Sequence, residues 1–183
     1  YAELATTKDY TLCGCNITFD MHHLYKRATD SQRTLLKDTP IWDIQLAEYL
    51  LSAQQTKFAS LDQLSHKYKL PLKDKLISEY FDKGLGADKI PVEFLKPYLE
   101  QDVSNTYHIA QQQYHRAIEA DMLPLMLSQM KALQATIEMS WNGLNIDKEY
   151  LTDYTLTVLR QLTTAKNKLE ITVGGLVEDW NSP

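Results

Sequence analysis

The pattern of apolar positions along the chain predicts a mostly helical protein with one buried strand. The run Thr11–Cys15 is apolar and has no helical period, which predicts the strand. Elsewhere, apolar residues recur at spacings of three or four, as they do on one face of a helix. The helices expected from this spacing cover residues 2–8, 20–29, 41–52, 61–64, 72–82, 97–120, 124–142 and 148–171.

Capping and helix-breaking residues set the expected helix ends. Pro97 is expected at the first position of a long helix, because proline is tolerated there but not in a helix interior. Ser60 and Asp147 are expected N-caps. The segment from residue 29 to Pro40 is expected to be a loop.

Two long helical patterns suggest how the chain is divided. On the helix at 97–120, one apolar stripe consists of Leu99, Val103, Ala110 and Tyr114. On the last helix, apolar residues repeat at about 3.5 positions, as in two long helices packed side by side. These residues are Leu151, Val158, Leu162, Ala165 and Leu169. We therefore expect a boundary near residue 120, between a mixed α/β unit and an antiparallel helix pair.

Composition and charge limit the classes of function that the sequence allows. The 183 residues are 44% hydrophobic and 23% charged, as in an ordinary globular chain, and no run of about 18 apolar residues predicts a membrane span. The net charge of -5 excludes attraction of nucleic acid by the overall field of the protein. Any such contact must be local or neutralised by metal ions. Because neither an initiator Met nor a signal peptide begins the sequence, we expect a segment of a longer cytoplasmic chain.

The two cysteines do not form a recognisable metal motif. Cys13 and Cys15 are two residues apart, so on a strand their side chains point to the same side. No second pair of ligands follows at a spacing typical of zinc sites. We therefore expect both thiols to be reduced and buried in the core.

Residues with catalytic potential follow the predicted strand directly. Asn16, Phe19 and Asp20 bring an amide, an aromatic ring and a carboxylate to its end, where α/β folds commonly build their sites. The alternative is that Asp20 only caps the helix that follows.

A second candidate pair lies in the long helix expected at 97–120. Tyr98 and Asp102 are four residues apart, so both face the same way. A phenol and a carboxylate on one face can orient a water, and together with a divalent ion they can form a hydrolytic site. The alternative is a half-buried tyrosine, hydrogen-bonded near a solvent-facing aspartate.

Taken together, these motifs resemble the 3′–5′ proofreading exonuclease domain of family A DNA polymerases, the bacterial and phage DNA polymerase I type. Gly14–Asp20 is similar to the second exonuclease motif of that family, with Cys15 in place of the usual His. Tyr98 and Asp102 match the third motif, Tyr-x-x-x-Asp. Further similarity to the family covers Asp43–Leu51, Ser60–Leu64, Met122–Leu125, Glu138, Gly143–Asp147 and Asn181–Pro183.

The resemblance implies a ribonuclease H-like (DEDD-type) α/β exonuclease fold at residues 1–120, incomplete because its first strands are missing. Residues 121–183 would then be the thumb helices that start the polymerase domain. The implied activity of the parent DNA polymerase is removal of mismatched 3′-terminal nucleotides, with two divalent ions, Mg²⁺ or Mn²⁺, as cofactors. Primer-template DNA and the rest of the polymerase chain are the implied partners. Nothing in the sequence indicates an oligomeric state.

The resemblance also assigns roles to individual residues. Asp20 and Asp102 would be metal ligands, and Tyr98 would orient the attacking water. Asn16 and Phe19 would bind the single-stranded 3′ end of DNA, the ring by stacking on a base.

One motif of the family is missing. Its first motif, Asp-x-Glu on the first strand, should precede Asn16, whereas the Asp-x-Glu at Asp147–Glu149 comes after both other motifs and fits a helix start. Two carboxylates hold two divalent ions poorly, so we expect this segment to be inactive alone. Two alternatives stay open: a non-catalytic scaffold domain of a polymerase, and an RNase D-like 3′–5′ exoribonuclease.

Three other groups of polar residues are weaker candidates for a functional role. The adjacent His22 and His23 are awkwardly placed to share a metal ion. Asp43 is expected to have a structural role. A basic cluster is expected to be a solvated face or a contact to a phosphate backbone; it consists of His66, Lys67, Lys69, Lys73 and Lys75.

Overall fold

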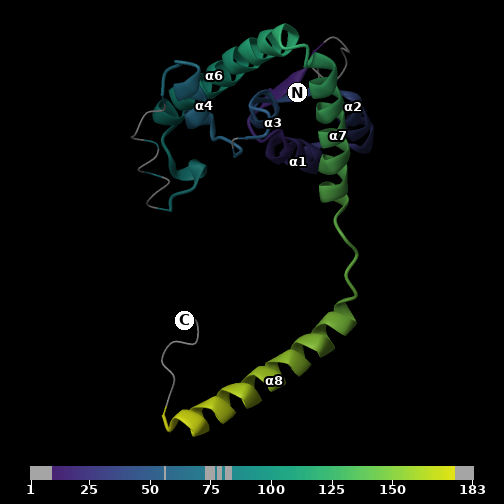
Figure 1. The fold of residues 1–183 in the computed structure, drawn as a ribbon, viewed down its shortest axis with the longest axis vertical. Helices are drawn as coiled ribbons and strands as arrows, with labels where there is room; N and C mark the ends of the chain where they lie inside the picture. The colour runs from purple at the N-terminus through teal and green to yellow at the C-terminus, as the bar shows by residue number, and fades with distance from the viewer. Residues whose placement is uncertain (1–9, 56, 73–76, 78–79, 81–83, 176–183) are drawn as a thin grey trace. The chain divides into compact units, whose positions relative to one another are not determined.

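The computed structural model describes residues 10–55, 57–72, 77, 80 and 84–175 (Figure 1). It divides the chain into two compact units, Tyr1–Asn142 and Gly143–Pro183. Most described residues are helical, as the sequence predicts. The first unit contains β1 (Leu12–Gly14), α1 (Ile17–Arg27), α2 (Asp30–Asp38), β2 (Ile41–Asp43), α3 (Ile44–Leu51), α4 (Leu61–Lys67), a short 3-10 helix (Ala87–Lys89), α6 (Val92–Glu119) and α7 (Leu123–Asn142).

β1 and β2 form a parallel two-stranded sheet, which confirms the strand predicted after Thr11. Leu12 pairs with Ile41 and Gly14 pairs with Asp43, and each strand runs almost directly into a helix. The prediction that residues 41–43 begin a helix was wrong, because these residues pair with β1 first. Two parallel strands bring both strand ends, and the helices that follow them, to one edge of the sheet.

Capping residues explain two of the short helices. Ser60 begins α4 with a capping box, in which its side chain and that of Gln63 each accept the other residue's backbone N–H. Thr29 and Gln32 make the same arrangement at the start of α2. The expected loop between residue 29 and Pro40 is therefore mostly helix.

The long helix α6 begins five residues before Pro97, so the predicted helix start was wrong. Pro91 occupies the N-cap position, and its carbonyl accepts the backbone N–H groups of Phe94 and Leu95 at 3.0 and 3.1 Å. Pro97 then lies inside the helix, where its missing N–H leaves the carbonyl of Glu93 without its usual intrahelical bond.

The core of the first unit lies between α6, α3, α1 and α7. Figure 1 shows α1 and α3 between the two longer helices. The buried apolar residues of α6 are Ile109, Ala110 and Ala117, and those of α7 are Met126, Met130 and Ile137. Only Ala110 of the expected α6 stripe is buried, whereas Leu99, Val103 and Tyr114 are exposed.

α7 packs against β2, α1, α3 and α6, so it belongs to the first unit. The compact units therefore divide after Asn142, where Gly143 adopts a positive φ of 66°. The functional boundary expected near residue 120 lies inside the first unit and stays a prediction. The packing of this helix as an antiparallel pair with the next one stays a prediction.

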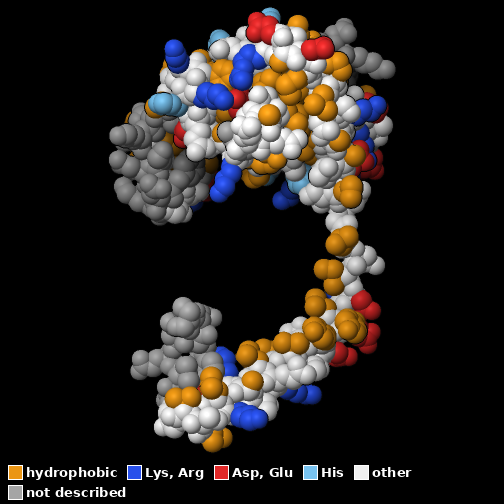
Figure 2. Space-filling model, in the orientation of Figure 1, with side chains coloured by type: hydrophobic (Ala, Val, Ile, Leu, Met, Phe, Trp, Pro, Cys, Tyr) orange, Lys and Arg blue, Asp and Glu red, His pale blue; other side chains and the backbone are white. Residues whose placement is uncertain are grey.

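The second unit consists of α8 (Lys148–Val173) and its flanking residues. Asp147 caps the helix as predicted, accepting the N–H of Tyr150 at 3.0 Å, and Gly174 ends it with a φ of 78°. α8 has no buried residue, and Figure 2 shows a run of hydrophobic side chains along it. Leu151, Val158 and Leu162 of the predicted seam each expose 40–48% of their surface.

Some expectations concern residues outside the described part of the chain, and another needs correction. The helix predicted at 2–8 and most of the one at 72–82 lie outside the described residues. Cys13 is exposed, so the expectation of a core thiol was wrong for this residue, whereas Cys15 is half-buried and packs against the core. No helix in the described part of the chain is long and apolar enough to cross a membrane.

Candidate functional site

The buried carboxylate of Asp43 ties together the starts of α1 and α3. Its Oδ2 accepts the N–H of Ile17 at 2.7 Å, and its Oδ1 accepts the N–H groups of Gln45 and Leu46 at 2.8 and 2.9 Å. Burial nevertheless raises the pKa of this carboxyl above its usual range. The expectation of a structural role for Asp43 is confirmed, since it fixes where α1 leaves the sheet.

Gly14 allows this close approach of α1 to the strand. A Cβ at Gly14 would lie 2.9 Å from both Cβ and Cγ1 of Ile17. Asn16 then makes the turn between β1 and α1 in the left-handed conformation, with φ 60° and ψ 55°, which asparagine tolerates better than most residues. Asn16 is exposed, and its side chain makes no capping hydrogen bond.

Asp20 lies in the first turn of α1 and its side chain is exposed. The alternative that it caps the helix was wrong, because Asn16 occupies the N-cap position. Partial burial raises the pKa of the Asp20 carboxyl, the negative charge of Asp43 raises it further, and the nearby His23 opposes the shift. Asp20 therefore stands beside both a like charge and an imidazole.

Phe19 presents an aromatic ring next to this carboxylate. The side chain is 62% exposed, and its ring lies against that of His23, with centroids 4.3 Å apart and planes inclined at 42°. The neighbouring His22 turns instead to α7, where its Nε2 lies 3.2 Å from the carbonyl oxygen of Ile137. The two adjacent histidines thus have different neighbours, in keeping with the expectation that they are poorly placed to share a metal.

Tyr98 and Asp102 are both half-buried on α6, one turn apart. Oδ1 of Asp102 is shielded from solvent, so Asp102 is not the solvent-facing residue of the alternative interpretation. An open hollow of about 440 Å³ lies on the neighbouring face of α6 and is lined by Leu99, Glu100, Val103, Ser104 and Tyr107.

The structure thus groups the candidate residues into two sets. Asn16, Phe19 and Asp20 share the start of α1, and Tyr98 and Asp102 share one face of α6. α6 packs against β1, the strand that leads into Asn16. The side-chain contacts between α6 and the sheet lie at Gln113 and Tyr114, which meet Trp42 of β2 about 17 Å along the helix from Asp102. Oxygen ligands such as these carboxylates suit Mg²⁺ or Mn²⁺. Among the described residues, however, no three His, Cys, Asp or Glu side chains are arranged to hold a metal ion.

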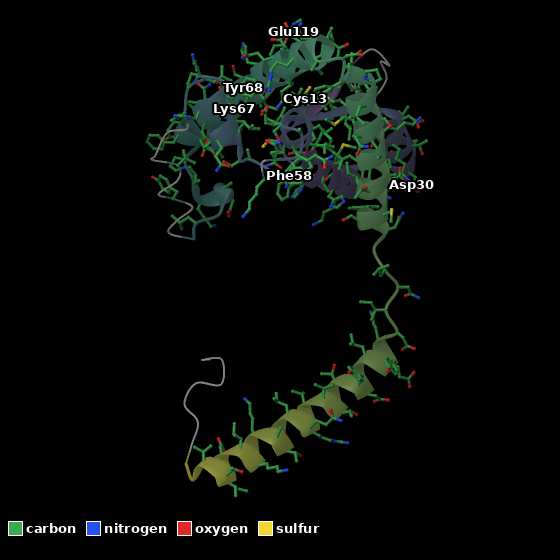
Figure 3. All side chains as sticks on the ribbon, viewed as in Figure 1. Cys13, Asp30, Phe58, Lys67, Tyr68 and Glu119 are labelled. Atoms are coloured by element: carbon green, nitrogen blue, oxygen red, sulfur yellow. The ribbon has the colours of Figure 1, made fainter. Side chains whose placement is uncertain are left out.

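An ionic cluster around the buried carboxylate of Glu48 joins α3, α4 and α6, and sequence patterns did not reveal it. The carboxylate of Glu48, 3% exposed, lies 2.6 Å from Nζ of Lys67 and accepts the hydroxyl of Tyr68 at 2.5 Å. Nε2 of Gln113 donates to it at 3.1 Å, and the guanidinium of Arg116 lies 3.4 Å away. Figure 3 shows Lys67 and Tyr68 side by side.

These partners outweigh the cost of burial and lower the pKa of Glu48 to about 2. The same carboxylate, together with burial, raises the pKa of the Tyr68 hydroxyl. Lys67 was expected on a solvated or phosphate-binding face, and its side chain is 49% exposed, but its ammonium group also pairs with Glu48. His66 and Lys69 are exposed, and Lys73 and Lys75 lie outside the described residues. An acid within the apolar helix Ile44–Leu51 was the available signal for this cluster.

Comparison with known proteins identifies no relative of this chain. No protein-family model matches the chain, and neither the curated proteins nor the solved structures include a significant match.

Proposed function

We propose that the chain is a segment of a family A DNA polymerase, with part of its 3′–5′ proofreading exonuclease at residues 1–120 and the start of its polymerase domain at 121–183. The proposal rests on the resemblance of the motifs at Gly14–Asp20 and at Tyr98–Asp102. A ribonuclease H-like fold belongs to the same proposal, and the parallel pair β1–β2 is compatible with it.

One observation supports this function more than any other. The motif Asn16–Asp20 follows a parallel strand at the carboxyl edge of the sheet, and the helix that carries Tyr98 and Asp102 packs against the same strand. α/β proteins bind ligands at this edge. Residues that are about 80 positions apart in the sequence therefore belong to directly contacting elements.

In the proposed reaction, Asp20 and Asp102 would hold divalent ions, and Tyr98 would orient the attacking water. Bound Mg²⁺ or Mn²⁺ would supply Lewis acidity and lower the pKa of that water. Asn16 and Phe19 would bind the frayed 3′ end. Four carboxylates normally share such a pair of ions, so activity requires the Asp-x-Glu strand in addition to the residues described here.

The test is degradation of a 5′-labelled single-stranded DNA by the longer polymerase chain, with Mg²⁺ or Mn²⁺ present. We expect Asp20→Ala and Asp102→Ala each to lower the rate by at least about 100-fold, because each removes a metal ligand. Glu119→Gln is the matched control, since Glu119 is exposed on α6 about 25 Å along the helix from Asp102 (Figure 3).

Each outcome of this test separates the proposal from its alternatives. Unchanged degradation by both alanine variants would refute the assignment of Asp20 and Asp102. DNA binding without any degradation would favour a non-catalytic scaffold domain, and faster degradation of RNA than of DNA would favour an RNase D-like enzyme.

A further inference from the structure

Phe19 and His23 form an exposed pair of rings on the first two turns of α1. Phe19 is 62% exposed, and His23 is exposed beside it, with ring centroids 4.3 Å apart. A large aromatic ring left in water forgoes the stabilisation that burial would give it. The sequence motif accounts for Phe19, but it assigns nothing to His23.

The His23 ring is held in a fixed orientation. Its Nδ1 lies 2.9 Å from the carbonyl oxygen of Phe19, and because a carbonyl only accepts, Nδ1 carries the proton and donates it. In the neutral ring, Nε2 then holds the lone pair. A ring fixed in this way loses little rotational freedom when another flat group stacks on it.

We propose that the Phe19–His23 pair is a stacking platform for an unpaired nucleobase. In this platform, His23 contacts the base in addition to Phe19 and lies next to Asp20. The inference rests on the proposed function only in taking single-stranded DNA as the ligand. Every base has a flat π-face, so such a platform binds without regard to sequence. His23 lies close enough to Asp20 for its charge to lower the pKa of that carboxyl. A stacked base would therefore sit next to the residue assigned to the metal.

The chain provides a matched control for His23. His108, on α6, is exposed and its Nδ1 lies 2.7 Å from the carbonyl oxygen of Ser104, four residues earlier, as in the bond between His23 and Phe19. Its ring meets that of Tyr107 edge to face, with centroids 5.6 Å apart and planes at 79°. His108 thus shares the local bond of His23, but its ring meets its aromatic neighbour edge to face, whereas the rings of Phe19 and His23 are inclined at only 42°.

The experiment measures binding of two fluorescent oligomers by anisotropy, in low salt with EDTA. One is oligothymidine of about 12 nucleotides, within the range of single-strand site sizes, and the other has the same backbone without bases. We expect Phe19→Ala and His23→Ala each to weaken oligothymidine binding by roughly 5-fold or more and to leave binding of the abasic oligomer unchanged. His23→Phe should retain oligothymidine affinity, because it keeps a ring, and His108→Ala should have no effect.

Three results would overturn the platform: oligothymidine affinity unchanged in His23→Ala, an equal loss for the abasic oligomer, or no oligothymidine binding by the unchanged chain. Circular dichroism checks that the variants keep their helix content, as expected for exposed positions. EDTA separates this test from the nuclease assay. If His23→Ala fails to weaken binding while Asp20→Ala abolishes degradation, only the platform is wrong. If binding depends on both rings while Asp20→Ala degrades DNA normally, only the exonuclease assignment is wrong.

Discussion

Replacing Glu48 by glutamine tests whether the ionic cluster between α3, α4 and α6 stabilises the fold. Glu48→Gln keeps the size of the side chain but removes the charge. It leaves Lys67 and Arg116 facing a neutral amide, and one oxygen that accepted hydrogen bonds becomes an NH₂ donor. We expect the variant to be less stable than the unchanged chain at neutral pH, and we expect this loss of stability to depend on pH.

The magnitude follows from the pKa of Glu48. Its carboxyl has a pKa of about 2 in the folded chain against an ordinary value of 4.5. At about 1.4 kcal/mol for each pH unit, this difference corresponds to about 3 kcal/mol at pH 7. Because the side chains of Lys67 and Arg116 are 49% and 38% exposed, solvent weakens their attraction, and we expect a loss of about 2–3 kcal/mol.

The sign of the pH dependence is fixed by the lowered pKa. The folded state holds Glu48 as the carboxylate, so the full stabilisation is present above pH 4.5 and is lost as the pH falls towards 2. The stability of the unchanged chain should therefore approach that of Glu48→Gln in this window. A glutamine does not titrate, so the variant itself loses no stability from this position.

Urea unfolding, followed by the fluorescence of the buried Trp42, measures the difference between pH 7 and pH 3. Glu119→Gln, which changes an exposed carboxylate on α6, is the control and should alter stability by less than about 0.5 kcal/mol at any pH. The reasoning would be refuted if the difference in free energy of unfolding between the unchanged chain and Glu48→Gln stayed constant down to pH 3, or if there were no difference at pH 7.

The remaining predictions concern the junction of β1 and α1. Asp43→Asn keeps one accepting oxygen but leaves the N–H of Ile17 without an acceptor, so urea unfolding should show a loss of about 1–3 kcal/mol, against no loss for the exposed Asp38→Asn. Equal stability of the two variants would contradict this role of Asp43. Gly14→Ala places a methyl group 2.9 Å from Ile17 and should cost about 1–3 kcal/mol, whereas Gly175→Ala, with open space around it, should be near neutral. A Gly14→Ala variant as stable as Gly175→Ala would show that the strand and helix can separate.

Features that depend on neighbouring residues were predictable from the sequence. The capping side chains of Ser60 and Asp147 and the helix end at Gly143 all lie where their local chemistry indicates. The helix α2 had an equally local signal, the Thr-x-x-Gln spacing from Thr29 to Gln32, which the apolar pattern obscured because that helix has no buried residue. Its prediction as a loop was therefore an avoidable error.

Features that depend on distant residues were not predictable in this way. Ile41–Asp43 is a strand only because β1 lies beside it, and its apolar residues also fit the start of α3. On α6, the buried face includes Asn105 and Gln113, so a search for apolar stripes selected a different face. Both polar side chains are buried because they have partners from other elements. Asn105 donates to Ser65 and to a backbone carbonyl, and Gln113 donates to the carbonyl of Ile44.

The candidate site shows the same division between local and distant causes. The spacing of Asn16, Phe19 and Asp20 is a local property and was visible in the sequence. The direction in which these side chains point is not local, because Asp43, on the other strand, holds the N–H of Ile17 and so sets the start of α1. The direction of the side chains of this motif therefore depends on β2, the strand beside β1. For this reason Asp43→Asn should lower the affinity for oligothymidine as well as the stability, although Asp43 itself need not touch DNA.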